Sequence, residues 1–166
     1  MQSPRERYEA VLRDTGCSPD VIAHCCTVTD YALTLAGDNP LIDRGLLEAG
    51  SMLHDIGRAT THSICHAQAG AQICRALGFP ESVARIIERH TGAGLTADEC
   101  TLLSLAPRDC MPRSIEERIV AHADNMVKGT HPVSVFETLS SAIHLHRKTR
   151  NRIYHLSLDV ELLCQR

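Results

Sequence analysis

A histidine and an aspartate stand side by side in the stretch MLHDIGR, at positions 54 and 55. The stretch closes an apolar run with helical spacing, and Gly57 is expected to end that helix. A histidine nitrogen and an aspartate oxygen can bind one metal ion together. Two adjacent residues of these types also occur by chance, so the pair needs support from the rest of the chain. Further candidate ligands stand upstream and downstream of it: His24, His66, His90 and Asp124.

Helical periodicity places these further candidates on apolar faces. Residues three, four and seven positions apart share one face of a helix. His24 shares its face with Val21 and Val28, and Asp124 shares its face with Val120. An inward histidine must be hydrogen-bonded or ligated, and an inward carboxylate needs a cation or several donors. One such histidine alone would be interpreted as a core residue with a backbone partner.

The joint placement favours a metal centre. Ligand-type side chains on different helices of one small domain would meet in the middle of a bundle, where helical proteins build metal sites. Nitrogen and carboxylate ligands without thiolate suit Fe, Mn, Co, Ni or Zn. The set exceeds what one ion takes while leaving room for water, so we expect one or two divalent transition-metal ions as the cofactor. The expected metal ligands are His24, His54, Asp55, His66, His90 and Asp124.

Helix start signals recur along the chain and predict an all-α fold, built as a compact helical bundle. Ser18 before Pro19 is an N-cap followed by a proline at the first helical position, and Ser63 is a further candidate cap. Capping boxes begin at Thr96 and Ser114. No strand alternation of useful length is present. Helices are expected over 4–13, 19–36, 40–53, 64–77, 80–90 and 115–127, with a short one after 96 and two segments beyond 132.

The composition fits this architecture and narrows the range of partners. The chain has 43% hydrophobic but only 3% aromatic residues, with no Trp, which suits packed helices better than sheets. The formal net charge of −3 shows no basic excess, so nucleic acid is not an expected partner. No apolar run reaches about 18 residues and no basic-then-apolar leader is present, so we expect a cytoplasmic protein without a membrane partner.

One domain is expected over residues 1–166, because no linker, repeat or shift in composition interrupts the chain. The motif-bearing core spans about 17–130, and 131–166 is expected to form a C-terminal helical extension. The eight cysteines are scattered without a C-x-x-C pair and are expected to be reduced thiols. The sequence carries no signal for the oligomeric state.

The motifs and their order resemble the HD-domain superfamily of metal-dependent phosphohydrolases. More narrowly, the chain is similar to the HDIG subgroup and its small stand-alone archaeal and bacterial members. The resemblance covers about residues 17–130 and implies an all-α bundle. The residues that carry it are His24, the HDIG of 54–57, the H-x-x-x-G of 66–70, His90 in ERHTGAG and Asp124 in VAHADN.

The resemblance implies two metal positions that share Asp55. Several dinuclear relatives have paired histidines where this chain has His90-Thr91, while the H-T-G stretch resembles a smaller branch that cleaves symmetrical dinucleoside tetraphosphates. The chain lacks the GYP triplet of the cyclic-di-GMP phosphodiesterases. It also lacks the acidic residue that follows the HD pair in alarmone hydrolases and mononuclear deoxynucleotidases. The first metal would be held by His24, His54, Asp55 and Asp124, and the second by Asp55, His66 and His90.

The implied function is metal-dependent hydrolysis of a phosphoester or phosphoanhydride bond in a small, nucleotide-like phosphorylated substrate. Asp55 and Arg58 would be the catalytic residues, with Arg58 on a phosphate unless it is a solvated arginine after the helix. His62 is either a proton donor or an exposed loop residue, and His122 is expected to be structural or to support the ligands. Two other functions stay open: a di-iron oxygenase, as in a minority of the superfamily, and a nucleotide-binding regulatory module without turnover.

Overall fold

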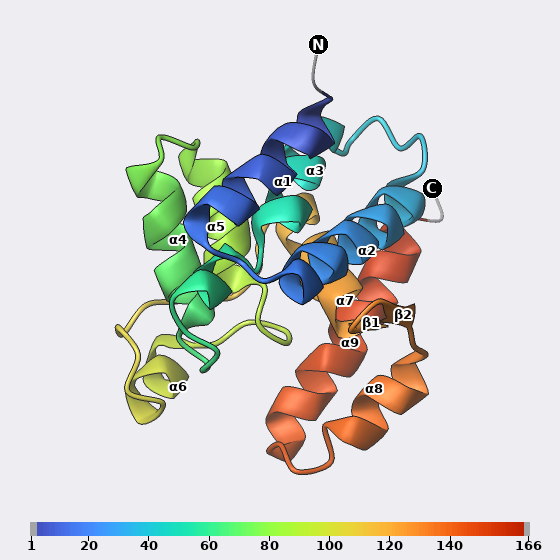
Figure 1. The fold of residues 1–166 in the computed structure, drawn as a ribbon. Helices are drawn as coiled ribbons and strands as arrows, with labels where there is room; N and C mark the ends of the chain where they lie inside the picture. Colours follow the sequence, from blue (N-terminus) through green and yellow to red (C-terminus); the bar gives the residue numbers. More distant parts are fainter. Residues whose placement is uncertain (1–2, 165–166) are drawn as a thin grey trace.

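Helices carry nearly all of the regular structure in the computed structural model, which describes residues 3–164 (Figure 1). The all-α prediction is confirmed, since the only strands among the described residues form one short hairpin. The elements in chain order are α1 (Pro4–Thr15), α2 (Pro19–Ala36), α3 (Arg44–Leu53), the 3-10 helix η1 (Ile56–Ala59), α4 (His66–Ala76), α5 (Glu81–Arg89), α6 (Ala97–Leu102), α7 (Ile115–Asn125), β1 (Val127–Lys128), β2 (His131–Pro132), α8 (Val135–Ser141) and α9 (Arg147–Cys164).

Side-chain caps begin several helices where the sequence predicts them. The Ser18 hydroxyl accepts a hydrogen bond from the backbone N–H of Val21 (3.4 Å) at the start of α2. At the start of α7, the Ser114 hydroxyl accepts from the N–H of Glu117 and the Glu117 carboxylate accepts from the N–H of Ser114, both at 3.2 Å. These caps fix where α2 and α7 begin, and therefore which of their faces turn toward the interior.

The helix predicted over 40–53 begins later than expected. The Asn39 side-chain oxygen accepts a hydrogen bond from the N–H of Leu41 (3.0 Å), and this local turn competes with helix formation. The helix α3 begins only after Asp43, whose carboxylate accepts from the N–H of Leu46 (2.9 Å). A cap is therefore present, but Asp43 supplies it, a few residues after Pro40, where the sequence predicts the helix to begin.

Ser63 does not cap α4, contrary to the prediction. Its hydroxyl lies 3.0 Å from the hydroxyl of Thr61, and its carbonyl accepts a hydrogen bond from the N–H of His66 (3.1 Å). Ser63 thus belongs to a turn that precedes the helix. The delay makes His66 the first residue of α4.

Gly57 does not end α3, because the helix already stops at Leu53. It lies instead where η1 contacts α4. A Cβ on Gly57 would collide with the carbonyl oxygen of His66 and would lie 2.6 Å from the backbone nitrogen of Gly70. Only glycine permits this approach, which brings the start of α4 against the end of α3.

The helix α3 lies between two hydrophobic clusters and contacts α1, α2, α5 and α7. In Figure 1, α4 and α5 lie together on one side, and α2, α7 and α9 lie on the other. The approach of α3 to α5 is close, since a Cβ on Gly50 would lie 2.6 Å from the side chain of Ile86. The C-terminal end of α3 therefore points into the space between the two groups of helices. No helix within 3–164 is long and apolar enough to cross a membrane.

Candidate metal centre

The HD pair lies at the C-terminal end of α3, inside the protein. His54 is fully buried and Asp55 is 3% exposed. The His54 Nδ1–H donates a hydrogen bond to the carbonyl of Ser51 (2.7 Å), one turn back along the helix. This bond fixes the orientation of the imidazole ring and leaves its Nε2 free to face the interior.

The other predicted ligands reach the same place from different segments of the chain. Two groups of ligand-type residues each have their ligand atoms within 4.8 Å of one another. The groups are His24, His54 and Asp124, and His54, Asp55 and His90. Nε2 of His66 lies 3.2 Å from Oδ1 of Asp55. The structure thus brings together all of the residues that the sequence predicts as ligands. They are, besides the HD pair, His24 from α2, His66 from α4, His90 immediately after α5, and Asp124 from α7.

The histidines of this cluster share one hydrogen-bond pattern. In each ring, Nδ1 lies 2.7–2.8 Å from a backbone carbonyl oxygen. A carbonyl can only accept, so Nδ1 carries the hydrogen and Nε2 of the neutral ring presents a lone pair. Metal-binding histidines hold their second nitrogen in this way. The accepting carbonyls are those of Gly129, Ser51, Ser63 and Ile87, for His24, His54, His66 and His90 in turn.

The carboxylate of Asp55 separates the ligands into two sets. Its Oδ2 lies 4.0 Å from Nε2 of His24 and 3.8 Å from Nε2 of His54. Its Oδ1 lies 3.2 Å from Nε2 of His66 and 3.6 Å from Nε2 of His90. One side chain thus presents each of its two oxygens to a different pair of imidazoles, as a carboxylate that bridges two ions would.

Asp124 completes the set on the Oδ2 side. Its Oδ1 lies 3.0 Å from Nε2 of His24 and 3.5 Å from Nε2 of His54. The Asp124 side chain is 24% exposed, whereas that of His54 is fully buried. This side of the cluster is therefore the one that combines two carboxylates with two imidazoles.

On the Oδ1 side, acceptor atoms face one another. Nε2 of His66 lies 3.1 Å from Nε2 of His90, although both atoms carry lone pairs in the neutral rings. The buried Oδ1 of Asp55 and the buried Nε2 of His54 have no hydrogen-bond partner among residues 3–164. Buried polar atoms without partners are costly, and a bound cation would satisfy both of these atoms. The nitrogen and oxygen donors present fit a divalent metal.

Burial and neighbouring charges oppose one another in setting the charge states of the cluster. Burial lowers the pKa of His54, but Cys25 and Asp55 outweigh it and hold that pKa well above its usual value, so His54 must lose a proton to bind a metal through Nε2. Burial alone would raise the pKa of the Asp55 carboxyl, but His54 and the other histidines around it hold that pKa well below its usual value. The pKa of Asp124 is likewise lowered by the histidines that face it, against the effect of burial. Burial, reinforced by the charge of His54, lowers the pKa of His90 to about 4. At neutral pH the cluster therefore presents two carboxylates and a neutral His90.

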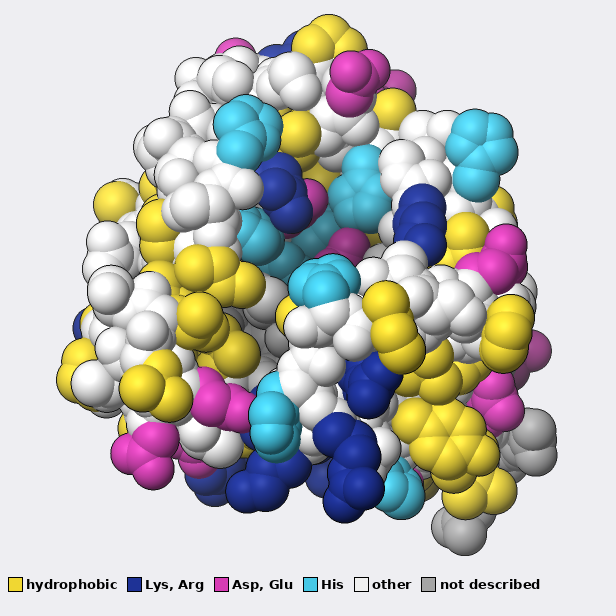
Figure 2. All heavy atoms as spheres, turned by 90° about the horizontal axis from the view of Figure 1, so that it is seen from below, with side chains coloured by type: hydrophobic (Ala, Val, Ile, Leu, Met, Phe, Trp, Pro, Cys, Tyr) yellow, Lys and Arg dark blue, Asp and Glu magenta, His cyan; other side chains and the backbone are white. Residues whose placement is uncertain are grey.

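An open cleft of about 300 Å³ leads to the cluster from the surface. Figure 2 shows this face as a hollow in which histidine, acidic and Lys or Arg side chains gather. Arg58 lines the cleft, and its Nε–H donates to Oδ2 of Asp55 (2.6 Å). His62 lines the same cleft and is exposed. Arg58 is therefore tied to the cluster rather than held in solvent alone.

Two contributions to the site were not predicted. The carbonyl of Gly129, in the turn of the β1–β2 hairpin, orients His24 (2.7 Å from its Nδ1). The hydroxyl of Thr91 is buried beside the cleft without a hydrogen-bond partner among the described residues. Strands of two residues are too short to show an alternating pattern in the sequence. A single threonine after a histidine carries no signal either.

His122, which the sequence placed outside the ligand set, is 2% exposed and its ring lies 6.5 Å from that of Tyr31.

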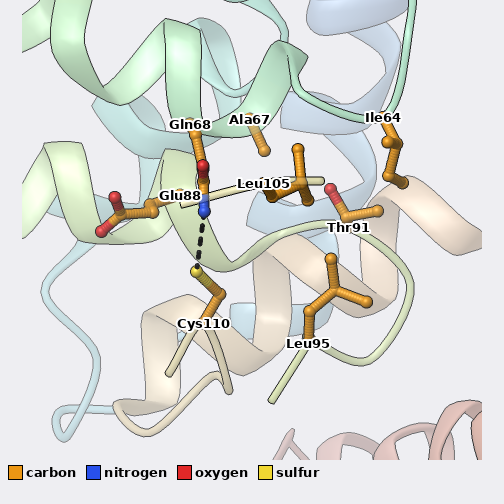
Figure 3. Close-up of a pocket in the computed structure, with 9 residues that line it drawn as sticks. Ile64, Ala67, Gln68, Glu88, Thr91, Leu95, Leu105 and Cys110 are labelled. Carbon is orange, nitrogen blue, oxygen red and sulfur yellow. Dashed lines mark hydrogen bonds between the residues drawn. The ribbon is translucent and has the colours of Figure 1, made fainter. Parts of the chain in front are cut away.

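A second, much smaller cavity lies behind Thr91 (Figure 3). Gln68 of α4 projects into it and lies 3.9 Å from the sulfur of Cys110. The same amide donates to the carbonyl of Ala106 (2.9 Å) and accepts from its N–H (3.0 Å). The space of about 10 Å³ suits a single water at most. Gln68 thus holds the loop after α6 against α4, and the open cleft is the site for a ligand.

The chain is similar to several known proteins. It is 46% identical over 138 residues to an uncharacterized protein of Methanocaldococcus jannaschii, covering 81% of each chain. It is 45% identical over 117 residues to a tRNA (cytidine(56)-2'-O)-methyltransferase of Picrophilus torridus, covering 70% of this chain but 34% of that protein. It is 28% identical over 131 residues to a ribonuclease Y of Acidothermus cellulolyticus, covering 78% of this chain and 23% of that protein.

The fold is similar to that of the HD domain of the PgpH phosphodiesterase from L. monocytogenes. The TM-score is 0.54 at 14% sequence identity, over 95% of this chain and 97% of the PgpH chain. The family model described as HD domain matches residues 21–128, a range that contains every ligand of the cluster. With the motif order, the helical fold and this match in agreement, the chain belongs to the HD-domain family.

Proposed function

We propose that this protein is a dinuclear metal-dependent phosphohydrolase that cleaves a phosphorus–oxygen bond of a nucleotide-like substrate. The HD-domain match and the His/Asp cluster support a metal-dependent phosphohydrolase in general. The observation that carries the finer proposal is the position of Asp55, whose two oxygens face different pairs of histidines.

The residues of the chain provide two adjoining sets of donors. When bound, divalent ions would lower the pKa of a water and neutralise charge on phosphoryl oxygens. The Nε2 atoms are aimed at the cluster by hydrogen bonds from each Nδ1 to a backbone carbonyl. The first ion would be held by His24, His54, Asp55 and Asp124, and the second by Asp55, His66 and His90.

Arg58 supplies a positive charge at the mouth of the cluster. Its Nε–H is taken by Asp55 at 2.6 Å, and its Nη groups make no hydrogen bond within residues 3–164. A guanidinium held by one edge can present its remaining donors to a phosphate. We therefore assign Arg58 to the phosphoryl oxygens, where charge increases during hydrolysis. His62, at the rim of the same cleft, is either a proton donor or only an exposed residue. The kcat of His62→Ala separates the two roles, because only loss of a proton donor would lower it.

The cleft and the similar proteins support a nucleotide-like substrate. A cleft of about 300 Å³ is of a size that accommodates a small ligand such as a nucleotide. The relatives include a ribonuclease and a tRNA methyltransferase, and the similar fold is that of a phosphodiesterase. The chain spans about a third or less of the ribonuclease and the methyltransferase, so their full activities are not transferred. The similarity to a ribonuclease and to a phosphodiesterase domain favours a nucleotide phosphodiester as the first substrate to try.

The test is a substrate panel with protein loaded in turn with Fe, Mn, Co, Ni and Mg. The panel contains a model phosphodiester, cyclic dinucleotides, dinucleoside polyphosphates, nucleoside monophosphates and short RNA. Hydrolysis is expected to require the metal and to be lost in Asp55→Asn, but to be unchanged in His155→Ala, which removes an exposed histidine outside the cluster. No turnover by fully loaded protein would contradict the proposal. An oxygen-dependent spectral change would then favour the di-iron oxygenase. Nucleotide binding without turnover would favour the regulatory module.

A further inference from the structure

Exposed apolar side chains are concentrated on the last two helices and on the segment that joins them. Six of the eleven large hydrophobic residues that are exposed among the described residues fall between positions 136 and 162. Figure 2 shows hydrophobic side chains gathered on the side where Figure 1 places α8 and α9. Phe136 is 79% exposed, Ile143 70% and Leu162 65%. A monomeric surface rarely gathers large apolar side chains in this way without a binding function.

These side chains form one continuous surface. Phe136, Ile143 and Tyr154 line a groove of about 400 Å³ between α8 and α9. Along α9, Leu158 and Leu162 follow Tyr154 at steps of four residues, so the same helix face continues beyond the groove. The opposite face of α9 is used by the core, through residues that include Ile153, Leu156 and Val160. The helix is therefore apolar on two faces, and the described chain covers only one of them.

The charges on this outer face are distributed unevenly along α9. Arg147 and Arg150 lie near its start and Glu161 lies near its end, all at helical spacing from the apolar stripe. None of these three side chains forms an ion pair within residues 3–164. Two copies of α9 packed antiparallel would place the basic end of each opposite the acidic end of the other. A parallel arrangement would instead bring like charges together, which disfavours it.

We infer that this face of α9, with the α8–α9 groove beside it, binds a second copy of the chain in an antiparallel, two-fold symmetric dimer. A two-fold interface requires a surface that is complementary to itself. The stripe meets that requirement, because Tyr154 of one copy comes opposite Leu158 of the other, and Arg150 comes opposite the end that bears Glu161. The 18 residues of α9 give a contact line about 27 Å long. This inference does not depend on the proposed activity.

The test is the dimer dissociation constant of the full-length protein, measured by sedimentation or light scattering over a concentration series. Leu158→Glu is expected to raise that constant at least about tenfold, because it buries a charge at the centre of the interface. Leu102→Glu is the matched control, since Leu102 is 84% exposed but lies on α6. The control is expected to leave the constant unchanged. Helical circular dichroism and metal content should be the same in all variants, which shows that each one folds.

A charge exchange tests the antiparallel register. Glu161→Arg alone is expected to weaken the dimer, because it places positive charge at both ends of the stripe. Adding Arg150→Glu to Glu161→Arg should restore affinity toward that of the wild type. A wild-type chain that stays monomeric at every concentration would overturn the inference and would assign the surface to a different protein. A dimer insensitive to Leu158→Glu, or a double variant no tighter than Glu161→Arg, would overturn it as well.

Discussion

The backbone carbonyls behind the histidines define the chemistry of individual residues in this protein. Each Nδ1–H is held at 2.7–2.8 Å from a carbonyl oxygen, so each Nε2 faces the cluster and presents a lone pair when its ring is neutral. The Nε2 atoms of His66 and His90 face one another at 3.1 Å, an arrangement that neutral rings tolerate only with a cation nearby. The metal-binding character of the site therefore follows from hydrogen-bond directions and not from residue types alone.

Removal of the HD pair should abolish metal binding. In the double variant His54→Ala, Asp55→Ala, the first ion loses two ligands and the second loses the carboxylate that the two share. Elemental analysis should find the metal gone while far-ultraviolet circular dichroism still reports a helical protein, because the hydrophobic clusters are untouched. Metal retained at the wild-type level in this variant would place the binding site elsewhere.

Loss of His66 or His90 should remove one ion only. Either His66→Ala or His90→Ala leaves Asp55 with few partners on its Oδ1 side, while the set around Asp124 is intact. We expect metal per chain to fall from about two toward one under saturating metal. His122→Ala is the control, because that buried histidine lies outside the cluster. A wild-type stoichiometry of one would instead indicate a mononuclear site with His66 and His90 as substrate contacts.

Arg58→Ala should damage catalysis without affecting metal content. A guanidinium is not a metal ligand, so the stoichiometry should equal that of the wild type. If Arg58 stabilises charge on the phosphoryl oxygens, kcat/KM should fall by roughly ten- to a thousandfold, as for the loss of one stabilising donor in other enzymes. Steady-state kinetics on a substrate found in the panel measures this. Full activity in Arg58→Ala would assign the residue to the support of Asp55 alone.

At the scale of the elements, glycine explains how helix α4 meets the HD turn. A Cβ at Gly57 would collide with the carbonyl of His66. Gly57→Ala should therefore lower the free energy of unfolding by about 1–3 kcal/mol through overpacking, and should weaken metal binding because α4 carries His66. Gly45→Ala is the control within the same region: its Cβ meets nothing closer than 3.5 Å, and alanine is the better helix former. Thermal and denaturant unfolding of both variants measure this difference. A Gly57→Ala variant as stable as the wild type would show that the close contact with α4 does not require glycine.

Much of the helical framework and the clustering of all six candidate ligands could be predicted from the sequence, for identifiable reasons. Caps such as Ser18 and Ser114 are local, and helical periodicity places His24 and Asp124 on the same faces as apolar residues. The start of α3 was mispredicted because Asn39 forms a local turn whose strength cannot be judged from residue types. The hairpin that carries the Gly129 carbonyl was missed because strands of two residues show no periodicity.

At the scale of the whole molecule, five segments of the chain meet at one point. They contribute the HD pair after α3, His24 from α2, His66 from α4, His90 after α5 and Asp124 from α7. The packing of α3 between two hydrophobic clusters brings these segments together. A metal that binds only the folded chain should stabilise it, by about 2.7 kcal/mol at a concentration one hundred times its dissociation constant.

The most direct measurement is anomalous diffraction from crystals of the whole protein loaded with Mn or Fe. We expect two anomalous peaks, one on each side of the Asp55 carboxylate. One should lie within bonding distance of ligand atoms of His24, His54 and Asp124, and the other within bonding distance of Nε2 of His66 and His90. A single peak would contradict the dinuclear centre, and peaks remote from Asp55 would contradict the site itself.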